Sequence, residues 1–216
     1  MIGHFDIPRS AGNRRSLSNK QRKQQGPIFL TKLLFFAGNS QGGSLNSRLV
    51  EASAELTQLN FPEIEDITLL RLSDYELPVF PSLEDGVPDI PIMAQDLRNL
   101  LAQADGIFIG SDEYTGTYST RFRNAVRWLA LAPGASVFAG KPIALCGASP
   151  GGVGGLRGHP ALGQLLRVMG GQVIAQKIHL GTATSAFDET GALLPRVQKQ
   201  LLEGAIKKLV QASQHL

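Results

Sequence analysis

Short apolar runs alternate along the chain with longer segments in which apolar residues recur every three or four positions. The first run, residues 32–37, is too short for a helix and ends at Gly38, so it predicts a strand buried on both faces. Apolar residues then recur at helical spacing between Leu45 and Leu59, and Ser44 is placed to cap that helix. The pattern therefore predicts a strand, a loop and a helix in succession.

The same alternation continues to the end of the chain. Further strands are predicted over residues 64–70, 105–110, 141–146 and 172–180, and further helices over 92–101, 122–129, 162–169 and 197–209. Four prolines between residues 71 and 91 predict a long connecting loop. Five strand–helix pairs predict an α/β fold, a doubly wound parallel sheet in three layers with helices on both faces. With five strands, the flavodoxin-like order 2-1-3-4-5 is the usual arrangement.

Composition fits a globular chain and excludes several kinds of site. Hydrophobic residues make up 43% of the 216 residues and charged residues 18%, and a single domain of this size buries about 70% of its unfolded surface. The one cysteine, Cys146, excludes an intramolecular disulfide, and its apolar strand predicts a core residue rather than a nucleophile. The four histidines lack the spacing of metal ligands, so no metal is expected. No apolar run reaches the roughly 18 residues of a membrane span, and a reducing, cytoplasmic setting fits the cysteine usage.

Positive charge is concentrated in the N-terminal segment. Residues 1–32 contain seven basic residues and one acidic residue, whereas the remainder contains 14 basic and 17 acidic residues. The segment has no apolar periodicity, and no aromatic residue lies among the basic ones between Arg9 and Lys23, which argues against a nucleic-acid-binding arm. We therefore predict that residues 1–30 form a basic extension, either a flexible tail or an arm laid across a neighbouring subunit, and that residues 31–216 form the domain.

The carboxyl ends of parallel strands meet at one edge of the sheet, and ligands of such folds bind there. The loop after the first strand runs from Gly38 to Ser47 and is small, polar and glycine-rich. It leads directly into a helix, whose free backbone N–H groups and dipole favour an anion such as a phosphate monoester. Ser40, Ser44 and Asn46 offer further donors, and a tight turn capped by Ser44 is the simpler alternative.

The loop after the third strand, residues 111–119, is polar and contains two acids and two tyrosines. Three interpretations stay open. Its backbone binds the edge of a planar ring while a tyrosine covers the face of the ring. Alternatively, Asp112 and Glu113 form an acid–base pair, or Thr117 or Ser119 simply caps the next helix.

The loop after the fourth strand, residues 147–157, contains five glycines. So many glycines are costly in backbone entropy. They indicate either a close approach of the backbone to a ligand or another chain, or a flexible surface loop.

Together the three loops resemble the NADPH-dependent FMN reductase family of flavodoxin-like proteins. The family's first motif, Gly-Ser-x-Arg-x-x-Ser-x-Asn, is matched by Gly38, Ser44 and Asn46. Its second motif, Pro-Glu-Tyr-Asn-Gly followed by a helix with Leu-Lys-Asn-Ala-x-Asp-Trp, is matched by Glu113, Tyr114, Gly116, Asn124, Ala125 and Trp128. Its third motif, Gly-Lys-Pro, a strand and Ser-Pro-Gly-Gly-x-Gly-Gly, is matched by Gly140, Lys141, Pro142, Ser149, Pro150, Gly151, Gly152, Gly154 and Gly155. The resemblance covers about residues 31–180, in order and at the family's spacing.

The resemblance implies FMN as cofactor and NADPH or NADH as co-substrate. It implies a phosphate site at Asn39, Ser40, Gln41, Ser44, Leu45, Asn46 and Ser47. It implies that the flavin ring lies against Asp112, Glu113, Tyr114, Thr115 and Gly116, chiefly their backbone groups, with Ser149, Pro150, Gly151 and Gly152 at its far edge. No catalytic side chain is expected, because FMN carries the chemistry.

Five positions depart from the family pattern, namely Asn39 for Ser, Gln41 for Arg, Asp112 for Pro, Thr115 for Asn and Arg127 for Asp. Losing one hydrogen bond from a charged group costs about 1.5–3 kcal/mol, so Gln41 predicts FMN binding about ten- to a hundred-fold weaker. Asp112 adds negative charge near a reduced flavin, provided that its side chain faces inward.

The predicted function is therefore electron transfer from NAD(P)H, through bound FMN, to a quinone, azo compound, metal oxyanion or free flavin. Two alternatives stay open: a flavodoxin-like electron carrier, and a relative that binds flavin weakly or not at all and acts as a binding or regulatory protein. The resemblance implies a homodimer or homotetramer with a small-molecule acceptor. The residues themselves predict no membrane partner and argue against nucleic acid as a partner. For Arg157, a salt bridge is expected in preference to contact with the phosphates of the nicotinamide dinucleotide.

Overall fold

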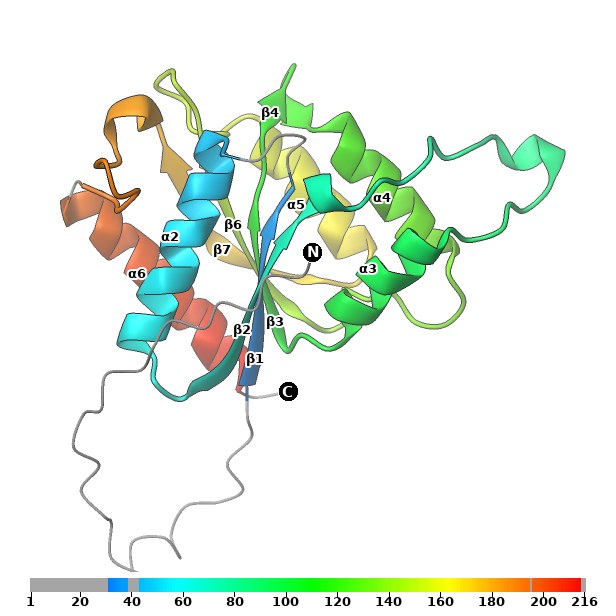
Figure 1. The fold of residues 1–216 in the computed structure, drawn as a ribbon, viewed down its shortest axis with the longest axis horizontal. Coiled ribbons are helices and arrows are strands. Elements are labelled where there is room, and N and C mark those ends of the chain that lie inside the picture. The colour runs from blue at the N-terminus through cyan, green and yellow to red at the C-terminus, as the bar shows by residue number, and fades with distance from the viewer. Residues whose placement is uncertain (1–30, 39–42, 195, 215–216) are drawn as a thin grey trace, which may run out of the picture.

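The structure is a computed structural model that describes residues 31–38, 43–194 and 196–214. The predicted basic extension, residues 1–30, lies outside the described residues, as do Asn39, Ser40 and Gln41. The described part of the chain forms a central parallel sheet between two layers of helices (Figure 1). None of the described helices is long and apolar enough to cross a membrane.

Five parallel strands make up the central sheet, β1 (Thr31–Ala37), β2 (Ile64–Arg71), β3 (Gly106–Gly110), β6 (Pro142–Ala148) and β7 (Gln172–Leu180). Their spatial order is β2-β1-β3-β6-β7. Because β4 and β5 belong to a separate hairpin, the five sheet strands follow the order 2-1-3-4-5. The predicted flavodoxin-like fold is therefore confirmed.

Helices cover both faces of the sheet, α2 (Leu45–Asn60) and α6 (Arg196–Ser213) on one, and α3 (Ile92–Ala102), α4 (Thr120–Leu131) and α5 (Gly158–Val168) on the other (Figure 1). Successive side chains of β1 divide between the two layers. Leu33 and Phe35 pack with α2 and α6, whereas Leu34 and Phe36 pack with α3, α4 and α5. This division explains why the strand is apolar at nearly every position.

The segment between β2 and α3, residues 72–91, extends away from the sheet (Figure 1). We call it the arm. It confirms the predicted long loop and contains two 3₁₀ helices, η1 (Leu72–Asp74) and η2 (Leu83–Asp85). Phe80 anchors it against Trp128 of α4, with ring centroids 4.8 Å apart, and the Trp128 Nε1–H donates to the Pro78 carbonyl at 2.8 Å. Trp128 therefore serves packing.

Two features differ from the sequence prediction. β4 (Glu113–Tyr114) and β5 (Thr117–Tyr118) form an antiparallel hairpin inside the segment predicted as a loop. Its turn residues Thr115 and Gly116 have φ of 48° and 79°, and hairpin turns of two residues favour such positive values. The hairpin is hard to predict because a β-branched residue is unusual at positive φ. In addition, α5 begins at Gly158, ahead of the predicted residue 162. The helix includes Pro160 in its first turn, where a proline is tolerated.

Candidate functional site

Three loops follow β1, β3 and β6 at the carboxyl edge of the sheet: loop 1 (residues 38–44), loop 2 (residues 111–119) and loop 3 (residues 149–157). Backbone hydrogen bonds tie the beginnings of two of these loops to the neighbouring strands. The Gly38 N–H donates to the Gly110 carbonyl at 2.9 Å, and the Ser111 N–H donates to the Cys146 carbonyl at 3.1 Å. The sheet order therefore sets the loops side by side, as predicted.

Loop 1 leads into α2, whose first turn provides backbone N–H groups and the positive end of the helix dipole. Ser44 caps the helix as predicted, because its Oγ accepts the Ser47 N–H at 3.2 Å. The Arg48 N–H donates to the Ser44 carbonyl, so the N–H groups of Leu45 and Asn46 precede the first bond along the helix. No acidic residue lies in this turn. The end of α2 thus has the donors and the dipole that suit a phosphate.

Asn46, in the first turn of α2, contacts loop 2 and the end of β6 through its side-chain amide, which is buried with 3% of the residue exposed. Its Oδ1 accepts the Ala148 N–H at 2.7 Å, and its Nδ2 donates to the Ala148 carbonyl at 3.1 Å and to Asp112 Oδ1. The amide is therefore occupied inside the protein and does not offer the free donor that the sequence predicted. Its structural effect is to hold loop 2 and the end of β6 against the start of α2.

Asp112 lies half-buried at the start of loop 2. Burial raises the pKa of its carboxyl, and the hydrogen bond from Asn46 partly offsets this increase. The side chain therefore faces inward, towards the first turn of α2. This inward orientation is the condition that the sequence-based prediction set for the charge of Asp112 to act on a bound flavin.

Glu113 uses its carboxylate to hold the end of loop 3. Oε1 accepts from Arg157 Nε at 2.8 Å, and Oε2 accepts the N–H groups of Arg157 and Gly158 at 3.1 and 3.2 Å. The Glu113 side chain is 11% exposed and that of Arg157 is 70% exposed. The predicted salt bridge of Arg157 is confirmed, and the carboxylate caps the beginning of α5. Within the hairpin, the backbone and the exposed Tyr114 are left to meet a ligand.

The glycines of loop 3 serve two purposes. Gly154 has φ of 57°, and a Cβ there would stand 2.5 Å from the Leu180 nitrogen, so this glycine permits close packing on β7. Gly151 and Gly152 are exposed, and a Cβ on either would have no neighbour within 4 Å. Close approach to the chain's own backbone therefore explains Gly154, whereas Gly151 and Gly152 line open space at the edge of the sheet.

His159 lies beneath loop 3, with 1% of the residue exposed and neither ring nitrogen hydrogen-bonded in normal geometry. Its ring centroid is 4.7 Å from that of His179. Burial, foremost, and the neighbouring His179 lower the pKa of His159 to about 4, so the ring is neutral near pH 7. Within the described residues, no three histidine, cysteine, aspartate or glutamate side chains converge on a metal position. Cys146 is fully buried in β6, where burial raises its thiol pKa, and the predicted core role is confirmed.

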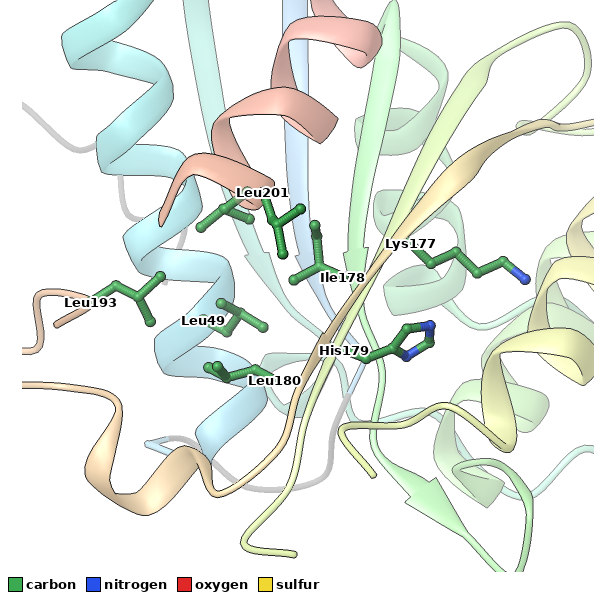
Figure 2. A pocket seen from close by; sticks show the side chains of 8 residues that line it. Leu49, Lys177, Ile178, His179, Leu180, Leu193 and Leu201 are labelled. Atoms are coloured by element: carbon green, nitrogen blue, oxygen red, sulfur yellow. The ribbon is translucent and has the colours of Figure 1, made fainter. Parts of the chain in front are cut away.

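A small apolar cavity of about 40 Å³ lies on the other side of β7 (Figure 2). Leu49, Ile178 and Leu193 point into it, whereas His179 and Lys177 point to the opposite side of the strand (Figure 2). This volume holds a water molecule but no aromatic ring system. A large ligand therefore does not fit in this cavity.

Two residues that organise the site were not singled out for that role from the sequence. The Ser119 Oγ donates to the Gly38 carbonyl at 3.0 Å while it accepts the Phe122 N–H as the cap of α4, so it ties loop 1 to loop 2. Ala148 contributes only backbone groups to the Asn46 amide. The sequence pattern of a helix cap identified Ser119 as a capping residue. No local pattern identifies Gly38 as the second partner of Ser119, or Ala148 as the partner of Asn46.

The arrangement fits FMN as the resemblance implied. The N–H groups at the start of α2 suit the phosphate, and the open surface at Gly151 and Gly152 leaves room for a ring opposite the hairpin of loop 2. The carboxylate of Asp112, in contrast, opposes an anion at the start of α2.

Comparison with known proteins identifies relatives of this chain. The chain is 26% identical over 183 residues to the NAD(P)H-dependent FMN reductase of Pseudomonas aeruginosa, which covers 82% of this chain and 92% of the relative. It is 30% identical over 152 residues to the quinone reductase of Escherichia coli, covering 67% of this chain and 73% of the relative. The flavoenzyme NAD(P)H:(acceptor) oxidoreductase FerB of Paracoccus denitrificans shares the fold, with a TM-score of 0.72, 20% identity, and coverage of 86% of this chain and 98% of that one. The NADPH-dependent FMN reductase family matches residues 31–185, and the chain therefore belongs to that family.

Proposed function

We propose that the protein binds FMN across loops 1, 2 and 3 and transfers electrons from NAD(P)H to a small acceptor of the quinone class. Family membership supports FMN and NAD(P)H, and curated relatives that carry the name quinone reductase support the acceptor class. The observation that carries the proposal is the junction at Asn46, where one buried amide holds loop 2 and the end of β6, after which loop 3 begins, against the start of α2.

The phosphate of FMN would lie at the start of α2. The backbone N–H groups of Leu45 and Asn46 would donate to it, supported by the cap formed by Ser44 and Ser47. The residues Asn39, Ser40 and Gln41, which are outside the described part of the chain, would close the phosphate site from loop 1.

The flavin ring would lie between loop 2 and loop 3. Backbone groups from Glu113 to Gly116 would bind its polar edge, and the exposed Tyr114 would cover part of one face. The residues from Ser149 to Gly152 would form the opposite wall. FMN, when bound, supplies the hydride and electron transfer. The protein would supply orientation and N–H groups where negative charge develops.

We also propose that the active form is a homodimer or homotetramer in the cytoplasm. The arm supports the oligomer, because its side chains Val79, Leu83 and Val87 are 87%, 53% and 77% exposed on a segment that leaves the body of the molecule. The buried free thiol of Cys146 fits a reducing compartment. Light scattering of the purified protein would give the oligomeric state, and a monomer at all concentrations would contradict it.

The first test is a titration of the purified protein with FMN, followed by fluorescence quenching, and then NADPH and NADH oxidation with a panel of quinones. A reductase consumes NAD(P)H over many turnovers, whereas an electron carrier binds FMN but needs a separate reductase. Saturable FMN binding with quinone-dependent turnover is the expected result. Absence of flavin binding at tens of micromolar FMN would favour the flavin-free alternative.

A matched pair of variants tests the location of the ring. A side chain at position 152 points into open space, so Gly152→Val should leave the melting temperature unchanged and block the ring, weakening FMN binding at least about tenfold. Ala175→Val places a valine on the exposed surface of β7 and should change neither property. Equal FMN affinity in both variants would place the ring elsewhere.

A further inference from the structure

The carboxylate of Asp112 lies at the end of α2 where the proposed function places a phosphate. Its Oδ1 accepts a hydrogen bond from Asn46, a residue of the first turn of α2. The positive end of the helix dipole therefore acts on an internal carboxylate as well as on any external anion. An internal anion at this position both occupies favourable potential and repels a second negative charge.

Charged neighbours do not neutralise Asp112. From α2, the Arg48 guanidinium stacks over Phe187 at 4.6 Å and so faces another part of the surface. From loop 2, Glu113 is paired with Arg157. No charged side chain among the described residues contributes to the pKa shift of Asp112, which is caused by burial and Asn46.

The sequence of the remaining part of loop 1 contains no cation either. Residues 39–42 are Asn, Ser, Gln and Gly, and loop 3 contributes no charge before Arg157. Compared with the family motif, Gln41 removes a positive charge and Asp112 adds a negative one. Both departures shift the electrostatic potential in the same direction, against a phosphate.

We propose that Asp112 sets the affinity of this site for phosphate-bearing flavin, because its carboxylate opposes the FMN phosphate at the start of α2 and makes binding tighten as the carboxyl takes up a proton. The inference rests on the proposed function. It assigns Asp112 a positioning and electrostatic role, not a catalytic one. Binding and protonation are linked reciprocally, so FMN binding should be accompanied by proton uptake in the pH range where Asp112 titrates.

The test compares the wild type with Asp112→Asn, using FMN and riboflavin as probes. Asparagine keeps an oxygen that can accept from Asn46 and removes only the charge. At about pH 8, the variant should bind FMN about tenfold more tightly than the wild type, because a unit charge that repels the phosphate has been removed. Riboflavin, which has no phosphate, should bind the two proteins equally. Asp96→Asn on the exposed surface of α3 is the matched control and should leave both affinities unchanged.

The pH profile separates a charge effect from a structural one. The ratio of the FMN dissociation constants of wild type and Asp112→Asn should fall towards one as the pH is lowered through the range in which the wild-type carboxyl takes up its proton. Asp112→Ser, which is also neutral, should reproduce the tighter binding if the asparagine variant folds poorly by circular dichroism.

The outcomes distinguish failure of the inference from failure of the proposed function. Equal FMN affinity in the wild type and both neutral variants overturns the inference while leaving the FMN site intact. Equal tightening of FMN and riboflavin overturns it too, since the phosphate would then not be the target of the charge. Absence of binding of either flavin to all the proteins overturns the proposed function, and the inference with it.

Discussion

Replacing Asn46 by alanine should be among the most destabilising single changes at the site. The change deletes three hydrogen bonds, each worth about 0.5–1.5 kcal/mol net. It also leaves the N–H and carbonyl of the buried Ala148 without their amide partner, at about 1–3 kcal/mol for an unsatisfied group. Partial relaxation reduces the sum, and we expect a loss of about 3 kcal/mol in the free energy of unfolding. For a domain of this size that corresponds to a fall of about 6–12 °C in melting temperature.

Urea unfolding followed by the fluorescence of Trp128, the only tryptophan of the chain, measures this loss directly. Asn99→Ala is the matched control, because Asn99 is exposed on α3 and alanine is the better helix former there. Its free energy of unfolding should be unchanged or slightly higher. A loss below about 1 kcal/mol for Asn46→Ala would refute the reasoning, since it would mean that loops 1, 2 and 3 do not depend on the amide for their arrangement.

Three further changes probe loop 3 and its supports. Glu113→Ala removes the nearly buried carboxylate that caps α5 and should cost about 2–3 kcal/mol in the free energy of unfolding. Arg157→Ala removes only the exposed partner of that carboxylate and should cost less than about 1 kcal/mol. Similar losses for the two variants in urea unfolding would contradict the capping role of Glu113. Gly154→Ala should lower the melting temperature by several degrees more than Gly151→Ala. Only Gly154 has a positive φ, and only there would a Cβ collide with the neighbouring backbone. Calorimetry of the two variants measures this difference in melting temperature. Burial lowers the pKa of His159 to about 4 in the native state. Between about pH 6.5 and 4 the unfolded chain therefore binds a proton that the native protein does not. The free energy of unfolding should fall with falling pH over this range, by up to about 3 kcal/mol. His159→Gln should flatten this dependence of the urea midpoint, and an unchanged profile would locate the titrating group elsewhere.

Local chemistry determined much of the fold from the sequence. The apolar run at residues 33–37 needs burial on both faces, and a central parallel strand provides it. The run therefore predicts that helices cover both faces of the sheet at this strand. Ser44 and Ser119 cap helices through groups two or three residues away, which a linear pattern can capture. The order of elements then limits the sheet to few topologies, because strand crossovers have one preferred hand.

The same topology explains why the edge that carries the site was predictable. Parallel strands end on one side, so the polar loops after the first, third and fourth strands had to meet there. The motif resemblance added the cofactor class, which spacing alone left open. The hairpin of loop 2 escaped prediction because Thr115 does not carry the usual signal of a residue at positive φ.

Tertiary structure alone decided what the individual side chains do. Asn46 has the sequence signature of a phosphate donor, yet its amide is used by Asp112 and Ala148, which lie 66 and 102 positions away. Glu113 has the signature of a ring-binding or acid–base residue, yet its carboxylate caps a helix 44 positions away. Hydrogen bonds are directional and saturable, so a donor committed to one partner is lost to another. Which partner is met depends on the packing of the whole sheet, and no local pattern in the sequence contains that information.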